Sequence, residues 1–313
     1  IGLGLNAKAA SIAGDLVVQN ARVRAVGEDA GGFKPISEKD LFDCEYWSLE
    51  QAKLGKGAAP KFQGKIVMIT GGSGTIGFTI AKAFSKLGAQ TILIDKDETS
   101  LKKAVDSLGT GHGYLTLDVT SPNAAEQAML GSIQKFGGLD ILISNAGAAH
   151  AGPMLSISED DLRDAFELNF FSHYSFSTAA AKIFQNQNRG GQILFNISKQ
   201  AVNPGKNFGA YGMPKATTFF LMKQLALELG ANGIRVNGVN ADRIRSGLLT
   251  DDFISSRAKS RGVSESDYMA GNLLNKEVTA EHVADAFTSL ACAESTTGHV
   301  MTVDGGNIEA SLR

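Results

Sequence analysis

The sequence predicts an α/β protein of the Rossmann type: a doubly wound parallel sheet flanked by helices, with an N-terminal helical extension. Two observations lead to this prediction. From Lys65 onward, short apolar runs alternate with longer amphipathic stretches, and a glycine-rich loop joins the first apolar run to the stretch after it. Such short runs are typical of strands that helices cover on both faces. Because strand and helix alternate strictly, right-handed crossovers bring the strands together in one parallel sheet.

The expected strands and helices follow one another along residues 65–303. The seven expected strands are residues 66–69, 91–94, 114–117, 141–144, 192–197, 234–239 and 299–303. One helix is expected to follow the glycine loop as far as Leu87, and the others lie near 97–107, 122–136, 158–187, 209–230 and 279–292.

Composition excludes several classes of function. The 313 residues carry a net charge of −2, without the basic patch that nucleic-acid or anionic-membrane binding requires. No apolar run approaches the roughly 20 residues that span a bilayer. The two cysteines, Cys44 and Cys292, form no disulfide framework and suit a reducing cytoplasm. The histidines form no ligand cluster, so we expect a cytoplasmic protein without a metal site.

Two amphipathic helices are expected before the Rossmann domain. Residues 6–28 carry apolar side chains at helical spacing, and Asn6 is a candidate cap. Ser37 and Asp40 form a candidate capping box for a second helix. Two helices cannot bury their apolar faces alone, so we expect them to dock on another part of the protein. The apolar stripe of the second helix comprises Leu41, Phe42, Tyr46, Trp47 and Leu54.

A short linker of small residues, 55–60, separates these helices from the rest of the chain. We therefore expect a helical extension or connector over residues 1–61 and the Rossmann domain over residues 62–313. The chain begins at Ile1, without methionine and without a signal sequence. A piece of a longer polypeptide or a processed product would begin in this way.

The glycine-rich loop from Thr70 to Gly77 predicts a dinucleotide site. It joins a strand to a helix, and its glycines let the backbone approach a pyrophosphate at the helix N-terminus. Outside that context, the same glycines would be read as an ordinary turn. The loop residues expected to contact the cofactor are Gly71, Ser73, Thr75, Ile76 and Gly77.

Two carboxylates at strand ends are candidates for the adenosine part of the site. Asp95 ends the second strand and can accept hydrogen bonds from ribose hydroxyls, which favours NAD over NADP. The neighbouring Lys96 weakens that preference, and a cap for the helix at 97–107 is the alternative role. Asp118 ends the third strand, where it either borders the adenine or caps the helix that starts near Pro122.

Tyr211 and Lys215 are four residues apart and lie on one face of the expected helix. An ammonium beside a phenol favours the phenolate, so we expect Lys215 to lower the pKa of Tyr211 from its usual ~10. Tyr211 would then transfer protons; the alternative is a solvated helix face. Pro214 is tolerated only in a first helical turn, so the helix should begin between Gly209 and Tyr211.

These motifs together resemble the short-chain dehydrogenase/reductase family over residues 62–313. They are Thr70-Gly71…Gly77, Asp118-Val119, Asn145-Ala146-Gly147, Asn169, Ser198, Tyr211-x-x-x-Lys215 and Val303-Asp-Gly-Gly306. Two positions differ from the usual pattern. The glycine loop fits the spacing TGxxGxxG, with Gly74 before Thr75, and Asn240-Ala241-Asp242 replaces the Pro-Gly usual after the sixth strand.

The resemblance implies an NAD-dependent oxidoreductase whose catalytic residues are Ser198, Tyr211, Lys215 and Asn169. Tyr211 would be the general acid or base, Ser198 would donate to the same substrate oxygen, and Lys215 would also bind the nicotinamide ribose. Asn169 would hold a water on a proton path from Lys215, or it would only bond its own helix backbone. The implied cofactor contacts beyond the loop are Asp95, Asp118, Val119, Asn145, Ala146, Gly147, Tyr211 and Lys215.

A closer resemblance is to bifunctional proteins in which a rhamnulose-phosphate-type aldolase precedes a short-chain dehydrogenase. It rests on residues 40–54, Ser198-Lys199, Asn237-Gly-Val-Asn240 and the ending Val303-Asp-Gly-Gly-Asn307. It implies that this chain is the C-terminal part and that an aldolase domain is missing from its N-terminal side. No aldolase zinc-ligand cluster is present, so we expect no aldolase activity here.

That resemblance implies a small hydroxy or carbonyl substrate such as lactaldehyde, in sugar catabolism of the rhamnose type. Because no nucleophilic cysteine is available, oxidation of an aldehyde to an acid would need its hydrate. A polyol or sugar-phosphate dehydrogenase of the sorbitol-6-phosphate type is the alternative. A non-catalytic assembly scaffold for a fused aldolase is an alternative of another class.

We also expect a homodimer or homotetramer and a lid over the substrate. The helix after Tyr211 is more apolar than one sheet face requires, and the equivalent helix of the family pairs between subunits.

Residues 242–275 are polar and would form a helical lid that selects the substrate. Their arginines would hold a phosphate or carboxylate, or would form a solvated face. The residues concerned are Phe219, Phe220, Leu221, Leu225 and Leu229 in the helix, Arg243, Arg245, Arg257, Lys259 and Arg261 in the lid, and His150 near the mouth.

Overall fold

The computed structural model describes residues 2–4, 7–47, 59–149 and 151–307. The chain divides into two compact units, residues 1–64 and residues 65–313. The domain boundary expected from the sequence lies at 61/62. Each unit is described by itself.

The N-terminal unit contains helices α1 (Ala7–Asp29) and α2 (Glu38–Glu45). Ser37 caps α2 as expected, since its Oγ accepts from the Asp40 backbone N–H at 3.1 Å and donates to the Asp40 carboxylate at 2.7 Å. Within α2, Phe42 stacks on Tyr46 with ring centres 4.4 Å apart. The candidate cap Asn6 and the end of the apolar stripe at Leu54 lie outside the described residues.

The second unit is the predicted Rossmann-type fold, a seven-stranded parallel sheet in the order β3-β2-β1-β4-β5-β6-β7. Its order reverses between β1 and β4, which are hydrogen-bonded neighbours. The strands begin and end within two residues of the expected positions. They are β1 (Ile66–Thr70), β2 (Gln90–Asp95), β3 (Gly113–Thr116), β4 (Ile141–Ser144), β5 (Gly191–Asn196), β6 (Ile234–Ala241) and β7 (Val300–Val303).

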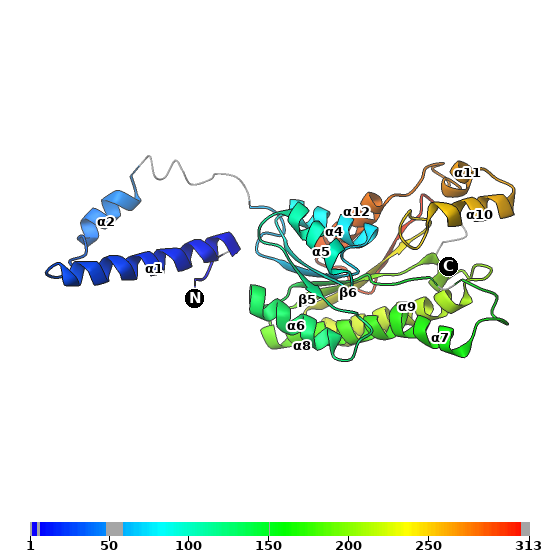
Figure 1. Cartoon of the computed structure of the whole chain (residues 1–313), viewed down its shortest axis with the longest axis horizontal. Coiled ribbons are helices and arrows are strands. Elements are labelled where there is room, and N and C mark those ends of the chain that lie inside the picture. The colour runs from blue at the N-terminus through cyan, green and yellow to red at the C-terminus, as the bar shows by residue number, and fades with distance from the viewer. Residues whose placement is uncertain (1, 5–6, 48–58, 150, 308–313) are drawn as a thin grey trace. The chain divides into compact units, whose positions relative to one another are not determined.

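Helices cover both faces of the sheet (Figure 1). On one face lie α4 (Thr75–Lys86), α5 (Glu98–Leu108) and α12 (Ala280–Cys292). On the other lie α6 (Ala124–Phe136), α8 (Ser172–Gln187) and α9 (Gly209–Leu229). This two-sided cover explains why all five residues of β1 and all four of β4 are buried. The apolar runs of the sequence therefore lie at the centre of the core.

The predicted helix at 158–187 is a single helical run with an irregular middle. It consists of α7 (Glu159–Phe166), a π-helical turn over Glu167–Phe171, and α8. Asn169 is fully buried within the π-helical turn. Such turns insert one residue into an α-helix and often occur at functional sites.

Helix α9 begins at Gly209, within the range expected from the sequence. Pro214 is its sixth residue and therefore lies in the second turn rather than the first. Proline lacks the N–H that would donate to the carbonyl of Ala210, so the helix gives up one internal hydrogen bond beside Tyr211.

The stretch expected to form a helical lid contains two short helices, α10 (Asp251–Arg261) and α11 (Glu265–Met269). Thr250 and Ser264 cap them through their side chains. The two helices share a small apolar cluster of Leu249, Ile254, Ala258, Tyr268 and Met269. This cluster makes the segment a packed substructure next to the sheet's carboxyl edge.

Candidate active site

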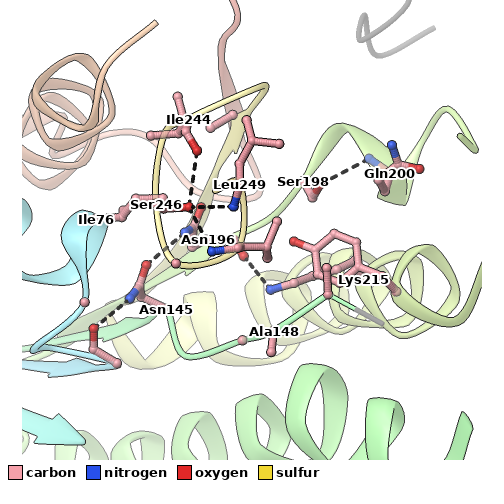
Figure 2. A pocket seen from close by; sticks show the side chains of 18 of the residues that line it. Ile76, Asn145, Ala148, Asn196, Ser198, Gln200, Lys215, Ile244, Ser246 and Leu249 are labelled. Atoms are coloured by element: carbon pink, nitrogen blue, oxygen red, sulfur yellow. Dashed lines mark hydrogen bonds between the residues drawn. The ribbon is translucent and has the colours of Figure 1, made fainter. Parts of the chain in front are cut away.

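A cavity of about 910 Å³ lies at the carboxyl ends of the central strands. Its walls come from the segments that follow β1, β2, β3, β4, β5 and β6 and from α9, α10 and α11. Ligands of open α/β sheets bind at this edge, where the strand order reverses. Figure 2 shows Ile244, Ser246 and Leu249 on one loop, above Asn145 and Ala148.

The glycine loop follows β1 and forms the start of α4. Gly71 has φ +63°, and a Cβ there would lie 3.0 Å from the Ala146 Cα. A Cβ on Gly77 would lie only 2.2 Å from the Gly71 carbonyl oxygen. Glycine is therefore required at both positions, and the backbone is open to a phosphate at the N-terminus of α4. Gly71, Thr75, Ile76 and Gly77 line the cavity, whereas Ser73 does not.

Asp95 and Asp118 both line the cavity, and both also stabilise the loops that carry them. Asp95 accepts from the Ser73 Oγ at 2.6 Å and the Ser73 backbone N–H at 3.2 Å, so it holds the glycine loop. Asp118 accepts from the Thr120 hydroxyl and backbone N–H, which lowers the pKa of its carboxyl. The cap of α5 is Asp97, so the alternative of Asp95 as that cap is wrong.

Asn145 connects the ends of three strands. Its Nδ2 donates to the Thr70 carbonyl at 2.9 Å, and its Oδ1 accepts from Asn196 Nδ2 at 2.8 Å. Asn145 therefore joins β1, β4 and β5 at the position where the strand order reverses. Ala146, Gly147 and Val119 line the cavity beside it.

Ser198 and Tyr211 lie together in the cavity wall, and their side chains are hydrogen-bonded. Ser198 follows β5, and Tyr211 is the third residue of α9. Burial raises the pKa of Tyr211 to about 12, an effect that the Ser198 hydrogen bond opposes.

Lys215 lies one turn further along α9 and is buried, with 3% of its surface exposed. Its Nζ donates to the Asn196 carbonyl at 3.1 Å, as Figure 2 shows, and lies 3.4 Å from His173 Nε2. Burial lowers the pKa of Lys215 to about 8. Lys215 therefore remains mostly protonated at neutral pH.

The expectation that the pKa of Tyr211 lies below its usual value is wrong, because burial raises this pKa. The two residues do share a helix face, but Nζ is directed to Asn196 and lies 5.9 Å from the centre of the Tyr211 ring. The cost of burying a phenolate therefore exceeds the benefit of the Ser198 hydrogen bond, and it sets the direction of the pKa shift.

Asn169 lies behind the cavity wall. Its Nδ2 donates to the Ala165 carbonyl of its own helix at 3.1 Å and to the Ala148 carbonyl at 3.0 Å. Its Oδ1 is buried and accepts no hydrogen bond from any described residue. A Cβ on Gly147 would lie 2.8 Å from this oxygen and 3.5 Å from Lys215 Nζ. Asn169 therefore bonds its own helix and also presents a buried acceptor close to Lys215.

His173 is a site residue that the sequence reasoning missed. Its ring is buried between Lys215 and Ser144, whose Oγ is 2.6 Å from Nδ1. Burial, followed by the charge of Lys215, lowers the pKa of His173 well below its usual value. Because an ammonium only donates, Nε2 accepts from Lys215 and Nδ1 donates to Ser144. The signal was available in the sequence, since His173 is one helical turn after Asn169.

A second missed feature is a buried ion-pair group around Asp242. Its carboxylate is 3.0 Å from Lys199 Nζ and 3.5 Å from Arg243 Nε, and it accepts a hydrogen bond from Asn307. Lys199 follows Ser198 directly, so Asp242 connects the segment after β6 to the segment after β5 that carries Ser198. Asp242 lies where the Pro-Gly of the family pattern would be.

The arginines after β6 do not share one environment. Arg243, Arg257 and Arg261 line the cavity, whereas Arg245 does not and forms ion pairs with Asp251 and Glu277. His150, expected near the mouth, lies outside the described residues.

Over the described ranges, no group of three His, Cys, Asp or Glu side chains could hold a metal ion. None of the described helices is long and apolar enough to span a membrane.

Two family models match the chain. One, described as Enoyl-(Acyl carrier protein) reductase, matches residues 71–307. The other, described as Aldolase class II, second domain, matches residues 1–54. The first therefore covers strands β2 to β7 and all residues that line the cavity, and the second covers most of the N-terminal unit.

Curated relatives are similar to the same regions. The uncharacterized oxidoreductase YuxG of Bacillus subtilis is 31% identical over 291 residues, which are 88% of this chain and 42% of that protein. The chain therefore spans less than half the length of this relative. Secoisolariciresinol dehydrogenase of Forsythia intermedia is 30% identical over 253 residues, which are 79% of this chain and 90% of that protein.

Solved structures share the fold. The crystal structure of a short-chain type dehydrogenase/reductase from Mycobacterium marinum matches with a TM-score of 0.71 and 25% sequence identity. The match covers 79% of this chain and 96% of that one.

We expect Gly77→Ala to lower the free energy of unfolding by about 1–3 kcal/mol, because its Cβ would meet the Gly71 carbonyl oxygen. Gly74→Ala is the matched control. Its Cβ would lie 3.5 Å from the same oxygen, so the loss should stay below about 1 kcal/mol. Urea denaturation of both variants measures the difference. Equal destabilisation would show that the close approach of Gly77 to Gly71 does not constrain the loop.

Proposed function

The chain belongs to the short-chain dehydrogenase/reductase family, whose members are oxidoreductases that act on alcohols and carbonyls, and we propose that it is an NAD-dependent member. The observation that supports the proposal best is the meeting of Ser198, Tyr211 and Lys215 with the glycine loop around one cavity. Phosphate-binding backbone and a proton-transferring group are the two parts that hydride-transfer chemistry needs.

The residues of the cavity fit a nicotinamide dinucleotide. Gly71, Gly77 and the N-terminus of α4 would hold the pyrophosphate, Asp95 the adenosine ribose and Asp118 the region of the adenine. Asn145, Ala146 and Gly147 form the wall between these parts and the catalytic residues. When bound, the nicotinamide supplies the donor or acceptor of the hydride.

Tyr211 moves the proton in our proposal. During alcohol oxidation its phenolate accepts the proton of the substrate hydroxyl, and during carbonyl reduction its phenol donates it. Ser198, hydrogen-bonded to Tyr211, donates to the same substrate oxygen and stabilises its developing charge. Its place directly after β5 keeps this donor on a rigid element.

Lys215 and Asn169 connect Tyr211 to solvent. Lys215 Nζ and Asn169 Oδ1 both approach the position that a Cβ of Gly147 would occupy, at 3.5 Å and 2.8 Å. Because residue 147 is glycine, no side chain separates the two groups, and a water beside Gly147 that contacts both would carry protons between them. His173 holds Lys215 from the opposite side and keeps its ammonium in place.

Asp95 favours NAD over NADP in this proposal. Its carboxylate lines the cavity at the end of β2, where it would accept from ribose hydroxyls and repel a 2′-phosphate. Lys96 lines the cavity next to it and weakens that repulsion.

The proposed substrate is a small hydroxy or carbonyl compound such as lactaldehyde. The two cysteines are free, but neither lines the cavity, so oxidation of an aldehyde would proceed through its hydrate. A polyol or sugar-phosphate dehydrogenase is the second candidate, since several cationic side chains line the same cavity.

We further propose a cytoplasmic homo-oligomer that is joined to an aldolase domain on its N-terminal side. The aldolase-type match to residues 1–54 supports that fusion. Helix α9 presents Phe220 and Leu227, which are 69% and 79% exposed, as a surface for a second subunit. Of the residues expected on this surface, Leu225 and Leu229 are instead buried in the core.

Tyr211→Phe should lower kcat by at least 10²-fold, because it removes the group that transfers the proton. The Kd for NAD and the Tm should remain near those of the wild type. NADH absorbance across a panel of polyols, hydroxy acids and aldehydes measures the rates. Turnover that survives in Tyr211→Phe would contradict the assignment of Tyr211 as the proton-transferring group. A wild type inactive on the whole panel would favour the assembly scaffold over the enzyme.

The pH profile should follow the raised pKa of Tyr211, about 12. Since the base form grows as pH rises, kcat/KM for oxidation should increase about tenfold per pH unit between pH 6 and 8. Reduction, which uses the phenol, should vary little over that range. A bend near pH 8 would mark deprotonation of Lys215. A plateau for oxidation below pH 8 would contradict Tyr211 as the base with this pKa.

Cofactor choice is tested by binding. We expect NAD to bind at least about tenfold more tightly than NADP, because of charge repulsion at Asp95. Asp95→Asn removes the charge at similar size and should bring the two Kd values closer together. Isothermal titration calorimetry measures both. Tighter binding of NADP to the wild type would refute the role of Asp95.

A further inference from the structure

One part of the cavity wall has an excess of positive charge. This wall, called the substrate wall here, consists of the cavity residues of segments 199–208 and 242–268. Its single carboxylate among the described residues is Asp242. Its cationic side chains are Lys199, Lys206, Arg243, Arg257 and Arg261.

Asp242 cannot neutralise this charge. Its two carboxylate oxygens are already shared between Lys199 at 3.0 Å and Arg243 at 3.5 Å. One negative charge offsets one of these two cations, so the pair leaves a net positive charge. Arg257 and Arg261 make no ion pair with any described residue.

Among the cations of the substrate wall, Arg257 is the best placed to bind an anion. Its guanidinium carbon lies 5.1 Å from the Phe208 ring centre and 5.7 Å from the Phe253 ring centre, so two rings hold it by cation–π contacts. No described residue accepts a hydrogen bond from its buried Nε. A buried donor without an acceptor is costly, and a bound anion would remove that cost.

Phe208 contacts both Arg257 and Tyr211, the residue proposed to transfer the proton. The Phe208 ring packs edge-on against the Tyr211 ring, with centres 6.5 Å apart. The guanidinium and the phenol are therefore separated by a single aromatic ring. A short substrate can place its reacting oxygen at Tyr211 and an anionic group at Arg257.

Arg261 strengthens the site. It follows Arg257 by one turn of α10, so the two side chains share a helix face. Its guanidinium carbon lies 5.3 Å from the Tyr268 ring centre, beside Arg243 at 4.8 Å from the same ring. Like charges on one helix face repel each other, and an anion between them would relieve that repulsion.

The other cationic side chains of residues 242–268 do not line the cavity. Arg245 is neutralised outside the cavity by Asp251 and Glu277, and Lys259 does not line the cavity. The cations of the substrate wall are thus not a continuous solvated face. The contacts of Arg257 with Phe208 and of Arg261 with Tyr268 hold these two side chains at the cavity, whereas Arg245 and Lys259 lie outside it.

We propose that Arg257, assisted by Arg261, forms an anion subsite, and that the substrate is a short hydroxy or carbonyl compound bearing a carboxylate or a phosphate. Guanidinium groups bind either anion through charge-assisted, bidentate hydrogen bonds. This inference rests on the proposed oxidoreductase function, and it favours a hydroxy acid or sugar phosphate over neutral lactaldehyde.

Three probes with one glycerol backbone test the subsite: glycerol, glycerate and glycerol 1-phosphate. With saturating NAD, the wild type should show kcat/KM about tenfold or more higher for an anionic probe than for glycerol. The anion that is preferred distinguishes a carboxylate from a phosphate subsite. Equal or better use of glycerol would overturn the proposal.

Arg257→Met keeps the aliphatic stem over Phe208 and removes the charge. It should lower kcat/KM for the preferred anion about 10- to 100-fold and leave glycerol within about twofold. Arg257→Lys should restore part of the loss, because it restores charge without the planar fork. Lys259→Met, on the same helix outside the cavity, should behave as the wild type. An equal loss for all three probes in Arg257→Met would overturn the proposal.

Binding separates this inference from the proposed function. Calorimetry should show glycerate or glycerol 1-phosphate binding to Tyr211→Phe, and at least tenfold weaker binding to Tyr211→Phe combined with Arg257→Met. If no probe is turned over but this difference appears, the reaction assignment fails and the anion subsite stands. If the two variants bind the anions equally, or neither binds them, the subsite is refuted.

Discussion

The candidate active site depends on the hydrogen bonds of one side chain, that of Asn145. It donates to the end of β1 and accepts from Asn196 at the end of β5, and its own backbone continues β4. The carboxyl ends of three parallel strands are thereby held at a fixed spacing at the point where the strand order reverses. The glycine loop leaves from the first of these strands and Ser198 from the third. Both halves of the site are therefore positioned through one amide group.

Burial sets the chemistry of the residues placed there. Tyr211 and Lys215 lie side by side on α9, yet burial shifts both pKa values toward the neutral form, to about 12 and about 8. With a pKa of about 8, Lys215 keeps its ammonium at neutral pH. The Asn196 carbonyl and the His173 ring accept hydrogen bonds from this ammonium. Among the described residues, the side chain that stabilises the Tyr211 phenolate is that of Ser198. The site thus contains a buried ammonium beside a phenol that resists ionisation.

Two parts of the site differ in how readily sequence reveals them. The residues proposed to contact a dinucleotide are local in sequence: Gly71 and Gly77 are six residues apart, and Tyr211 and Lys215 are one turn apart. Spacing alone indicates their shared role. The contacts of His173 and Asp242 join elements that are distant in sequence, namely α8 with α9 and β6 with the segment after β5. Spacing places His173 one helical turn after Asn169, but its contact with Lys215 and the contact of Asp242 with Lys199 depend on how helices and loops pack.

By itself, the sequence determined the parallel sheet, its strands to within two residues and most of the glycine-loop residues that line the cavity. Periodicity, glycine spacing and strand ends are local properties, and they are sufficient for these features. Only the tertiary structure decided which arginines of residues 242–261 line the cavity and which are neutralised by Asp251 and Glu277 outside it. It also decided that the pKa of Tyr211 rises instead of falling. The reason is the same in both cases: charge and solvation depend on which groups packing brings within a few ångströms, and on how much water it removes.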